Sequence, residues 1–372
     1  MIIKSIFLQN FRNYKEEKLD FIKDINIIYG ENAQGKTNIL ESIYLCSTAR
    51  SHRTTKVKEL IKSDSEKMKV SVDVEKNETI TNIEFNYIIN EKKLIKINEI
   101  PIKKTGELMG QLSAVIFAPE DLFIIKDGPS ERRRYIDIMI SRIKPSYFYS
   151  LQRYFKIIKQ KNSLLKEIQK DRKKEYIKEI WDITAAKEAI KIIKERSLII
   201  KELNNNSKIW HNKISNEKEK LIIEYENNMD VEIKNDNKEE MLKEIIKKIK
   251  KLNEREIETG NTLIGPHRDD IKIKINDKSL KAYGSQGQQR TAVLSMKLSE
   301  IDIIKKYTDE YPILLLDDIM SELDEGRRKK IIENIKNIQT FITCTDYEYF
   351  KKTIKRKIKY FKIENGKLIE EK

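Results

Sequence analysis

An octapeptide with the spacing of a phosphate-binding loop, Gly-x-x-x-x-Gly-Lys-Thr, restricts the fold of this chain more than any other feature. It runs from Gly30 to Thr37. Residues 26–29 before it are mostly apolar, as in a buried strand, and residues 38–44 after it carry apolar side chains at helical spacing. A strand, a glycine-containing loop and a helix in this order predict an α/β nucleotide-binding fold, because a helix N-terminus attracts phosphate.

Each part of the loop has a chemical task in such a fold. Backbone N–H groups turn inward around the phosphates, and the residues assigned to this cradle are Gly30, Glu31, Asn32, Ala33, Gln34 and Gly35. The Lys36 ammonium is expected to reach the β- and γ-phosphate oxygens, and the Thr37 hydroxyl to hold Mg²⁺. The loop therefore predicts binding of a nucleoside triphosphate together with Mg²⁺.

Size and composition narrow the class of protein. The chain has 372 residues, enough for two or three domains. It contains no run of eighteen apolar residues, so no membrane span is expected. Cys46 and Cys344 are its only cysteines, too few for a disulfide framework or a Cys-rich zinc site, which favours a reducing cytoplasm.

The formal charge of +15, from 75 Lys and Arg against 60 Asp and Glu, leaves two interpretations open. A nucleic-acid partner would explain the excess of basic residues. A general bias toward Ile, Lys and Asn would raise the charge equally without creating a site, since lysine suits a solvated surface as well as a phosphate contact. The charge thus permits DNA binding and does not establish it.

Glycine and proline divide the chain into regions of different character. Residues 130–259 contain no glycine and residues 146–265 no proline, so this stretch is expected to be helix-rich. Residues 69–102 alternate like antiparallel strands. Short strands are expected again after Gly260, with an Asn-Gly hairpin at residues 363–368.

These regions predict one nucleotide-binding domain built from both ends of the chain, with a helical insertion between them. The expected limits are 1–128 for its N-terminal part, 129–259 for the insertion and 260–372 for its C-terminal part. Apolar side chains recur at three- and four-residue steps in the insertion, beginning at Tyr147. This stripe fits either a core face, the commoner use, or a partner-binding face.

An acidic pair follows the apolar residues 313–316. Alone, it is only a buried strand with a polar end. Combined with an upstream phosphate loop, it fits a Walker B strand, in which a carboxylate at the strand's end holds the Mg²⁺ of the bound nucleotide. Asp317 is therefore assigned to Mg²⁺, across from Thr37, and Asp318 to the attacking water.

A short Gly/Ser loop, Gly284–Arg290, precedes a helical segment and forms a second anion-binding helix end. Because the chain already has one phosphate loop, the second suggests use in trans, with Ser285, Gly287 and Gln288 closing on the nucleotide of a partner copy. This loop resembles the signature motif of ABC-type ATPases, in which two heads sandwich two nucleotides, and Ser321–Asp324 resembles their D-loop. An ordinary N-capped helix after a turn is the alternative interpretation.

The chain as a whole resembles the RecF family of bacterial recombination-mediator ATPases, relatives of the SMC and Rad50 heads. The matching stretches follow the family order: Leu8–Tyr14, Gly30–Thr37, Ser51–Thr54, Phe117–Leu122, Gly128–Arg134, Thr262–Asp270, Gly284–Arg290 and Leu316–Asp324. The resemblance implies a P-loop ABC-type ATPase head with an antiparallel β subdomain and a helical insertion. Sustained heptads, which an SMC or Rad50 arm would need, are absent from the insertion.

The resemblance also implies an ATP-dependent homodimer on DNA, with weak hydrolysis releasing the clamp through Lys36, Asp317, Asp318 and Ser285 acting in trans. Members act at single-strand gaps and ss/ds junctions in replication, recombinational repair and SOS induction, where RecR and RecO help RecA replace single-strand-binding protein. By the same resemblance, Arg12 would contact the phosphates or couple ATP to DNA. A surface ion pair is the alternative role of Arg12.

Departures from ABC-type ATPases bear on catalysis. Asp318 stands where those enzymes usually carry glutamate, and Thr343–Asp346 occupies the place of their switch histidine. No Q-loop glutamine is identifiable, and residues 117–122 occupy that region. These features are consistent with weak turnover.

Two polar clusters do not indicate where DNA would bind. Arg132–Arg134 would grip phosphates or neutralise neighbouring acids, and His267–Asp270 is expected to form a polar network. The rival functions are an SMC-like structural organiser and a generic NTP-driven enzyme, such as a nuclease or a transporter subunit. An SMC-like organiser would need long heptad helices, a nuclease an additional acidic metal cluster, and a transporter subunit a membrane-facing partner. The sequence supports none of these.

Overall fold

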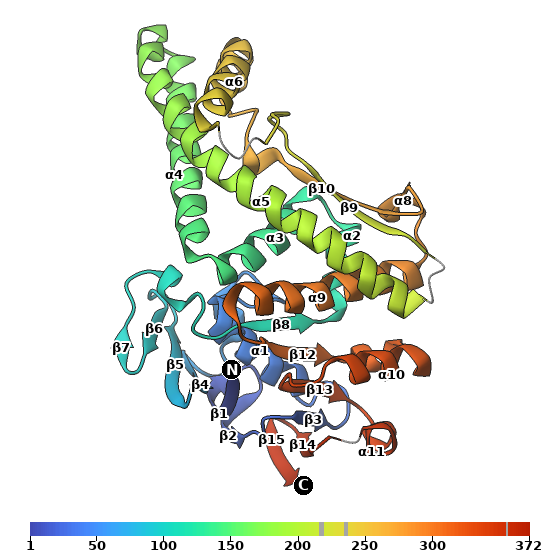
Figure 1. Ribbon diagram of the computed structural model, residues 1–372. Coiled ribbons are helices and arrows are strands. Elements are labelled where there is room, and N and C mark those ends of the chain that lie inside the picture. Colours follow the sequence, from blue (N-terminus) through green and yellow to red (C-terminus); the bar gives the residue numbers. More distant parts are fainter. Residues whose placement is uncertain (216–218, 234–236, 355) are drawn as a thin grey trace. The chain divides into compact units, whose positions relative to one another are not determined.

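The computed structural model describes residues 1–215, 219–233, 237–354 and 356–372, without the side chains of Ser321, Glu322, Tyr349, Lys352 and Thr353. The chain forms two compact units (Figure 1). The first comprises Met1–Leu122, Lys213–Asn216 and Val293–Lys372, and the second comprises Phe123–Asn212 and Glu217–Ala292. The domain limits expected at 128/129 and 259/260 stay a prediction, since compactness alone does not define a domain.

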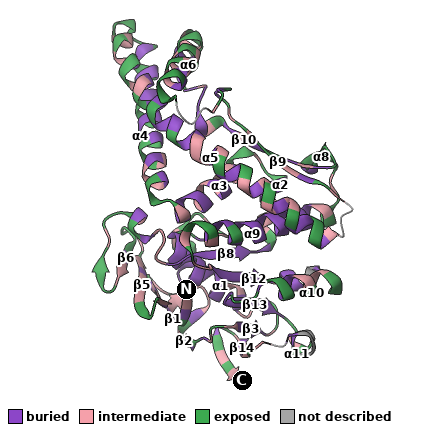
Figure 2. Cartoon of the chain, viewed as in Figure 1, coloured by how far each residue is buried: buried purple, intermediate pink, exposed green. Residues whose placement is uncertain are grey.

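A six-stranded sheet in the first unit carries the phosphate-binding loop. Its order is β15-β14-β3-β13-β12-β8, and neighbouring strands are parallel except in the terminal hairpin β14–β15. The bounds are β3 Ile25–Tyr29, β8 Ala114–Phe117, β12 Ile313–Asp317, β13 Thr340–Cys344, β14 Ile358–Glu364 and β15 Lys367–Glu371. Every residue of β3, β8, β12 and β13 is buried, as expected for parallel strands covered on both faces (Figure 2).

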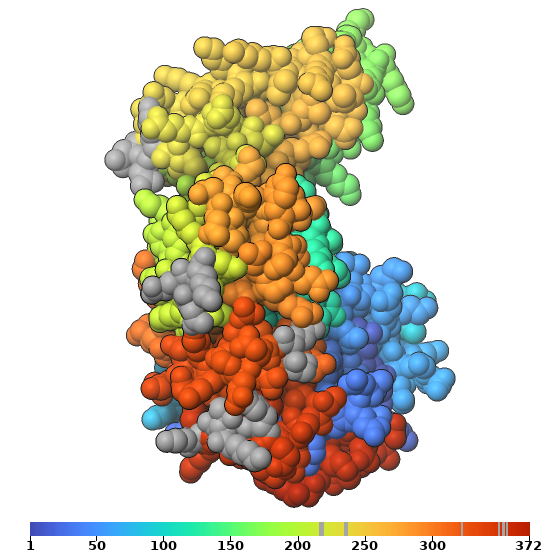
Figure 3. Space-filling model, turned by 90° about the vertical axis from the view of Figure 1, so that its right-hand side faces the viewer, coloured from blue at the N-terminus to red at the C-terminus, as the bar shows by residue number. Residues whose placement is uncertain are grey.

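The strands expected around residues 26–29, 313–317 and 341–344, and the Asn-Gly hairpin near the C-terminus, are therefore confirmed. On the surface of this unit, N-terminal residues in blue lie beside C-terminal residues in red (Figure 3). The same proximity follows from the pairing of β3 with both β13 and β14. Parallel strands end at one edge of the sheet, so the loop after β3 and the acids after β12 are brought to the same side.

A second six-stranded sheet in this unit is antiparallel, as the alternation of residues 69–102 predicted. Its order is β2-β1-β4-β5-β6-β7, and its bounds are β1 Ile2–Phe11, β2 Tyr14–Asp20, β4 Lys67–Lys76, β5 Thr79–Ile88, β6 Leu94–Ile97 and β7 Ile100–Pro101. Val70, Val72 and Val74 point into the core on one face of β4. Helix α1 (Lys36–Thr48) contacts both sheets, so the helix that begins at the phosphate loop is held on two sides.

Short helices complete the first unit, together with most of the long helix α9 (Gln286–Thr308), which begins in the second unit. Their bounds are η1 Val57–Leu60, η2 Thr105–Leu108, η3 Pro119–Leu122, η6 Ile319–Glu322, α10 Glu325–Asn334 and α11 Glu348–Thr353. Among the residues that the structure describes, no helix has both the length and the apolar character that crossing a bilayer requires.

The second unit is mainly helical, as the absence of glycine and proline predicted. Its helices are α2 Phe123–Lys126, α3 Pro129–Ile143, α4 Pro145–Ile168, η4 Arg172–Ile177, α5 Lys178–Ser215, α6 Lys238–Lys251, α7 Asn253–Thr259, η5 Pro266–Arg268 and α8 Leu280–Tyr283. The unit also holds a three-stranded sheet in the order β11-β10-β9, with bounds β9 Leu221–Glu226, β10 Asp270–Ile275 and β11 Lys278–Ser279.

Strand β9 was not foreseen, because it lies inside the stretch expected to be helical. Leu221 and Ile223 are buried in it with the period of two that a strand requires, and they pair with β10 along its whole length. Much of the apolar stripe of the insertion is core, since Tyr147, Tyr154 and Ile158 are buried. Phe155 and Ile180, in contrast, are exposed.

The two polar clusters of the second unit, Arg132–Arg134 and His267–Asp270, contact each other. The Arg132 guanidinium donates to both Asp270 carboxylate oxygens, at 2.7 and 3.0 Å, and Arg133 Nη1 donates to the Asp269 carbonyl oxygen at 2.6 Å. His267 Nδ1 lies 2.7 Å from the Tyr154 hydroxyl. The acid-neutralising interpretation is thus confirmed for Arg132, and His267 and Asp270 take part in the expected polar network.

Candidate nucleotide-binding site

The Lys36 side chain lies inside the phosphate-binding loop. It is the first residue of α1, is 7% exposed, and its Nζ donates to the carbonyl oxygens of Gly30 at 2.6 Å and Glu31 at 2.7 Å. Burial lowers the pKa of Lys36, whereas the negative charges of Asp318 and Asp317 favour its protonated form. A desolvated ammonium held in this way gains strongly from an anion brought into the loop.

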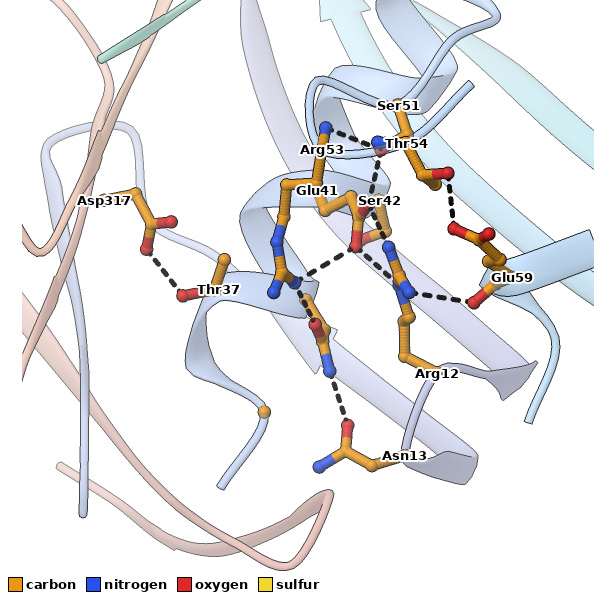
Figure 4. Close-up of polar contacts among 12 residues, drawn as sticks. Arg12, Asn13, Thr37, Glu41, Ser42, Ser51, Arg53, Thr54, Glu59 and Asp317 are labelled. Atoms are coloured by element: carbon orange, nitrogen blue, oxygen red, sulfur yellow. Dashed lines mark hydrogen bonds and ion pairs between the residues drawn. The ribbon is translucent and has the colours of Figure 1, made fainter. Parts of the chain in front are cut away.

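The two predicted Mg²⁺ ligands meet directly. Thr37 Oγ1 donates to Asp317 Oδ1 at 2.8 Å (Figure 4). Thr343 Oγ1 donates to the same oxygen at 2.7 Å and accepts from the Asp318 backbone N–H at 2.8 Å. Thr343, in the place of the switch histidine, therefore joins the Asp317 carboxylate to the Asp318 backbone, a contact that the sequence did not indicate.

The Asp317 carboxylate is buried, with 3% of the residue exposed. Burial raises its pKa above the ordinary range, although the hydrogen bonds from Thr343 and Thr37 act in the opposite direction. A buried carboxylate beside a hydroxyl is a hard-oxygen donor set of the kind that Mg²⁺ prefers. The residues present therefore fit the ion expected here.

These groups open into a cavity of about 580 Å³. The lining residues all belong to the first unit: Arg12, Asn13, Asn32, Ala33, Gln34, Gly35, Lys36, Thr37, Asn38, Arg53, Glu59, Ile61, Lys62, Ser63, Asp318 and Thr343. The phosphate-binding loop, Asp318 and the turn between β1 and β2 thus converge on one space. Its volume suits a ligand of nucleotide size.

Arg12 forms an ion pair with Glu41, a residue of α1 that is fully buried (Figure 4). Arg12 Nε and Nη2 donate to the two Glu41 carboxylate oxygens at 2.8 and 2.7 Å, and Nη1 donates to the Glu59 carbonyl oxygen at 2.8 Å. Burial alone would raise the pKa of Glu41, but hydrogen bonds from Arg12 and Ser51 hold it below its ordinary value. The ion-pair interpretation of Arg12 is confirmed, with the pair largely buried, and its contact with a nucleotide stays a prediction.

Arg53 and Glu120 are charged residues near the acids that sequence reasoning left without a role. Arg53 Nη1 donates to Asn38 Oδ1 at 3.1 Å, and its Nε lies 3.7 Å from Glu120 Oε1. The pKa of Glu120 is raised by burial and further by the charge of Asp317. In the sequence, both residues are distinguished only by their position in stretches that resemble the RecF family.

The signature loop belongs to the second unit and caps helix α9. The Ser285 backbone N–H donates to Gln288 Oε1 at 2.9 Å, and the Gln288 N–H donates to Ser285 Oγ at 3.2 Å. Gln288 Nε2 also donates to Glu219 Oε1 at 2.9 Å, which occupies its side chain. Ser285 and Gly287 are exposed.

The capped-helix alternative is therefore correct as geometry, and the role in trans stays a prediction. In the expected D-loop, the side chains of Ser321 and Glu322 lie outside the described residues. Asp324 caps α10 by accepting from the Arg327 N–H at 3.0 Å.

Comparison with known proteins identifies the family to which this chain belongs. Residues 2–368 match the RecF/RecN/SMC N terminal domain family. The chain is 50% identical over 367 residues to the DNA replication and repair protein RecF of Acetivibrio thermocellus, with 99% of both chains covered. The chain belongs to the RecF family. It is likewise 48% identical to the RecF protein of Ruminiclostridium cellulolyticum over 369 residues, again with 99% of each covered.

Solved structures agree with this RecF assignment. The chain superposes on a structure of the recombination mediator protein RecF with ATP at a TM-score of 0.92, with 41% identity and coverage of 99% of this chain and 97% of that one. It shares only the fold with the Smc head of Pyrococcus furiosus, at a TM-score of 0.54 and 17% identity, with 99% and 96% covered. This RecF family member therefore has the ABC-type ATPase head fold, as predicted.

Proposed function

We propose that this chain is an ATP-dependent DNA-binding clamp of the RecF kind. It acts at single-strand gaps and ss/ds junctions in replication, recombinational repair and SOS induction. One observation carries the proposal: Thr37 and Asp317, 280 residues apart, are joined at 2.8 Å beside a lysine buried in the phosphate loop. The solved RecF structure with ATP, so similar over its whole length, supports ATP as the nucleotide.

In this proposal the phosphate loop and Lys36 bind the triphosphate, and Thr37 and Asp317 hold Mg²⁺. The ion neutralises charge that develops on the transferred phosphoryl group. Asp318 orients the attacking water. Its shorter side chain, compared with glutamate, must reach from a backbone in the left-handed region (φ 51°), which fits slow hydrolysis.

Replacement of Asp317 by asparagine tests the metal role. The amide removes the charge but keeps the size, so the gain in ATP affinity that Mg²⁺ provides is expected to fall at least about tenfold. ATP affinity in EDTA should match that of the unaltered protein. Calorimetric titrations with and without Mg²⁺ measure both quantities, and Asp20→Asn, at an exposed site, serves as the control. Equal Mg²⁺ dependence in the two variants would remove Asp317 from the metal site.

The dimer of the proposal forms when Ser285 and Gly287 of one copy close on the γ-phosphate bound to the other. The exposed loop at the N-terminus of the 23-residue helix α9 supports this role, because such helix ends bind anions. DNA, RecR, RecO and RecA are the proposed partners, in the cytoplasm. The net charge of +15 is compatible with DNA.

Replacement of Ser285 by arginine tests the clamp. The bulky side chain is expected to leave ATP affinity within about twofold of the unaltered protein, and to prevent ATP-driven dimers by obstructing the approach of the partner. Sedimentation with and without ATP, in the presence of a labelled gapped duplex, measures dimer formation and DNA binding together. Ser163→Arg, on the exposed face of α4, is the control.

Normal dimers of Ser285→Arg would reject the role in trans. An unaltered protein that binds ATP but stays monomeric with both ligands would favour a generic ABC-type NTPase or a structural SMC-like head instead.

A further inference from the structure

We propose that the turn of the terminal hairpin, Asn365 and Gly366 between β14 and β15, positions the phosphate-binding loop and thereby sets the affinity for ATP. This inference rests on the proposed binding of ATP. The hairpin lies more than 300 residues from the loop in sequence and contains none of the motif residues, yet it contacts the loop at its tip. Both belong to the first unit.

Gln34, at the tip of the loop, receives three hydrogen bonds from outside the loop. The Gly366 backbone N–H donates to the Gln34 carbonyl oxygen at 3.0 Å, and the Asn365 N–H donates to Gln34 Oε1 at 2.6 Å. Asn13 Nδ2 donates to the same carbonyl oxygen at 2.9 Å. Two separate turns, one after β1 and one after β14, therefore hold a single residue of the cradle.

The two turns also pack against each other with no spare room. A Cβ on Gly366 would lie 2.6 Å from the Asn13 carbonyl oxygen. Asn365 and Gly366 adopt left-handed φ values of 49° and 69°, typical of the tight hairpin turn that Asn-Gly favours. Only glycine at position 366 therefore permits the turn to reach the loop.

The loop needs this support because part of its backbone adopts an unfavourable conformation. Ala33, next to Gln34, has a φ of 64°, a left-handed conformation that non-glycine residues rarely adopt. Such a conformation persists where surrounding contacts over-determine it. The hairpin also contacts the start of the loop, where a Cβ on Gly30 would lie 2.4 Å from the Ile363 carbonyl oxygen. The hairpin thus pre-organises the N–H groups of the cradle before the phosphates arrive.

The experiment compares Gly366→Ala with Gly110→Ala. Both substitutions place alanine at a positive φ in the first unit, but none of the residues that the structure describes lies within 4 Å of a Cβ at position 110. The strain is therefore similar, and only the first variant displaces the hairpin turn. We expect Gly366→Ala to weaken ATP binding at least about tenfold, since small misplacements of positioning groups have effects of this size. Gly110→Ala should stay within about twofold.

Gln34→Ala provides a second route if Gly366→Ala folds poorly. It removes the side-chain acceptor for the Asn365 N–H and keeps the backbone acceptor for the Gly366 N–H, so ATP affinity should fall about threefold to fivefold. The double variant should bind no more weakly than Gly366→Ala alone, because both changes break the same contact. Titration calorimetry with ATP and Mg²⁺ measures the affinities, and thermal unfolding of each variant separates them from stability.

Gly366→Ala or Gln34→Ala with unaltered ATP affinity would overturn the positioning role, as would additive effects in the double variant. An unaltered protein that fails to bind ATP would instead refute the proposed function itself, and this inference with it. The two failures are distinguished by the first titration.

Discussion

Replacement of Lys36 by alanine is expected to abolish measurable ATP binding, with Kd raised at least about a hundredfold. The Lys36 ammonium is buried and held by the carbonyl oxygens of Gly30 and Glu31, so no other cation of the loop can take its place. An alanine also leaves these two carbonyl oxygens facing the phosphates without a donor between them. Titration with ATP and Mg²⁺ measures the loss.

Lys18→Ala is the matched control for Lys36→Ala, because Lys18 is exposed and its nearest acid, Asp20, lies 4.0 Å away. Such a surface pair contributes little, so its removal should leave ATP affinity unchanged. A Lys36→Ala variant that binds ATP as tightly as the Lys18→Ala variant would refute the phosphate-loop assignment. Thermal unfolding without nucleotide should show that both variants are folded.

Replacement of Arg196 by methionine is expected to destabilise the second unit by about 3–5 kcal/mol. The Arg196 guanidinium, 1% exposed, donates to both Asp137 carboxylate oxygens at 2.9 Å and to Asp269 Oδ2 at 2.8 Å. Methionine fills much of the space but leaves these two carboxylates without their shared cation. An uncompensated buried charge is far more costly than a lost surface contact.

The chain offers a convenient probe for the Arg196→Met variant. Its two tryptophans, Trp181 and Trp210, both lie in α5, so intrinsic fluorescence during denaturant unfolding reports on the second unit. Arg172→Met is the control, since the Arg172 side chain is 53% exposed and pairs with Glu254 at the surface. The control should change the free energy of unfolding by less than about 1 kcal/mol.

The pH dependence distinguishes a lost ion pair from lost packing. Burial already raises the pKa of Asp269 beside Arg196, and removing the cation is expected to raise it further. A native state that takes up protons more readily than the unfolded chain loses stability as pH rises. The destabilisation by Arg196→Met should therefore shrink from about pH 8 to about pH 5, and a destabilisation that is constant over this range would argue for packing alone.

The local elements of the site could be predicted because they depend on spacing and periodicity. The strand before the phosphate loop, helix α1 after it and the buried strand before Asp317 all follow from runs of apolar residues at fixed steps. The Asn-Gly turn was likewise evident from its dipeptide. Periodicity failed at β9, where a short alternating segment lay inside a long stretch without glycine or proline.

The partners of individual side chains could not be predicted in this way. Arg12 had two interpretations until the structure placed it on Glu41, and nothing in the sequence distinguishes Glu41 from the other residues of the helix that follows the phosphate loop. Thr343 was noted only as a replacement for histidine, yet its hydroxyl joins Asp317 and Asp318.

The sequence by itself determined the phosphate loop, the strands that flank the acids and the membership of the RecF family, because each is written in contiguous residues. Only the tertiary structure decided that Glu41 binds Arg12, that Thr343 joins the Asp317 carboxylate to the Asp318 backbone and that the Asn365–Gly366 turn contacts Gln34. Hydrogen bonds form over about 3 Å between residues that lie tens to hundreds of positions apart in the chain. Which of these residues come into contact depends on how the whole chain folds, and local sequence patterns do not determine that.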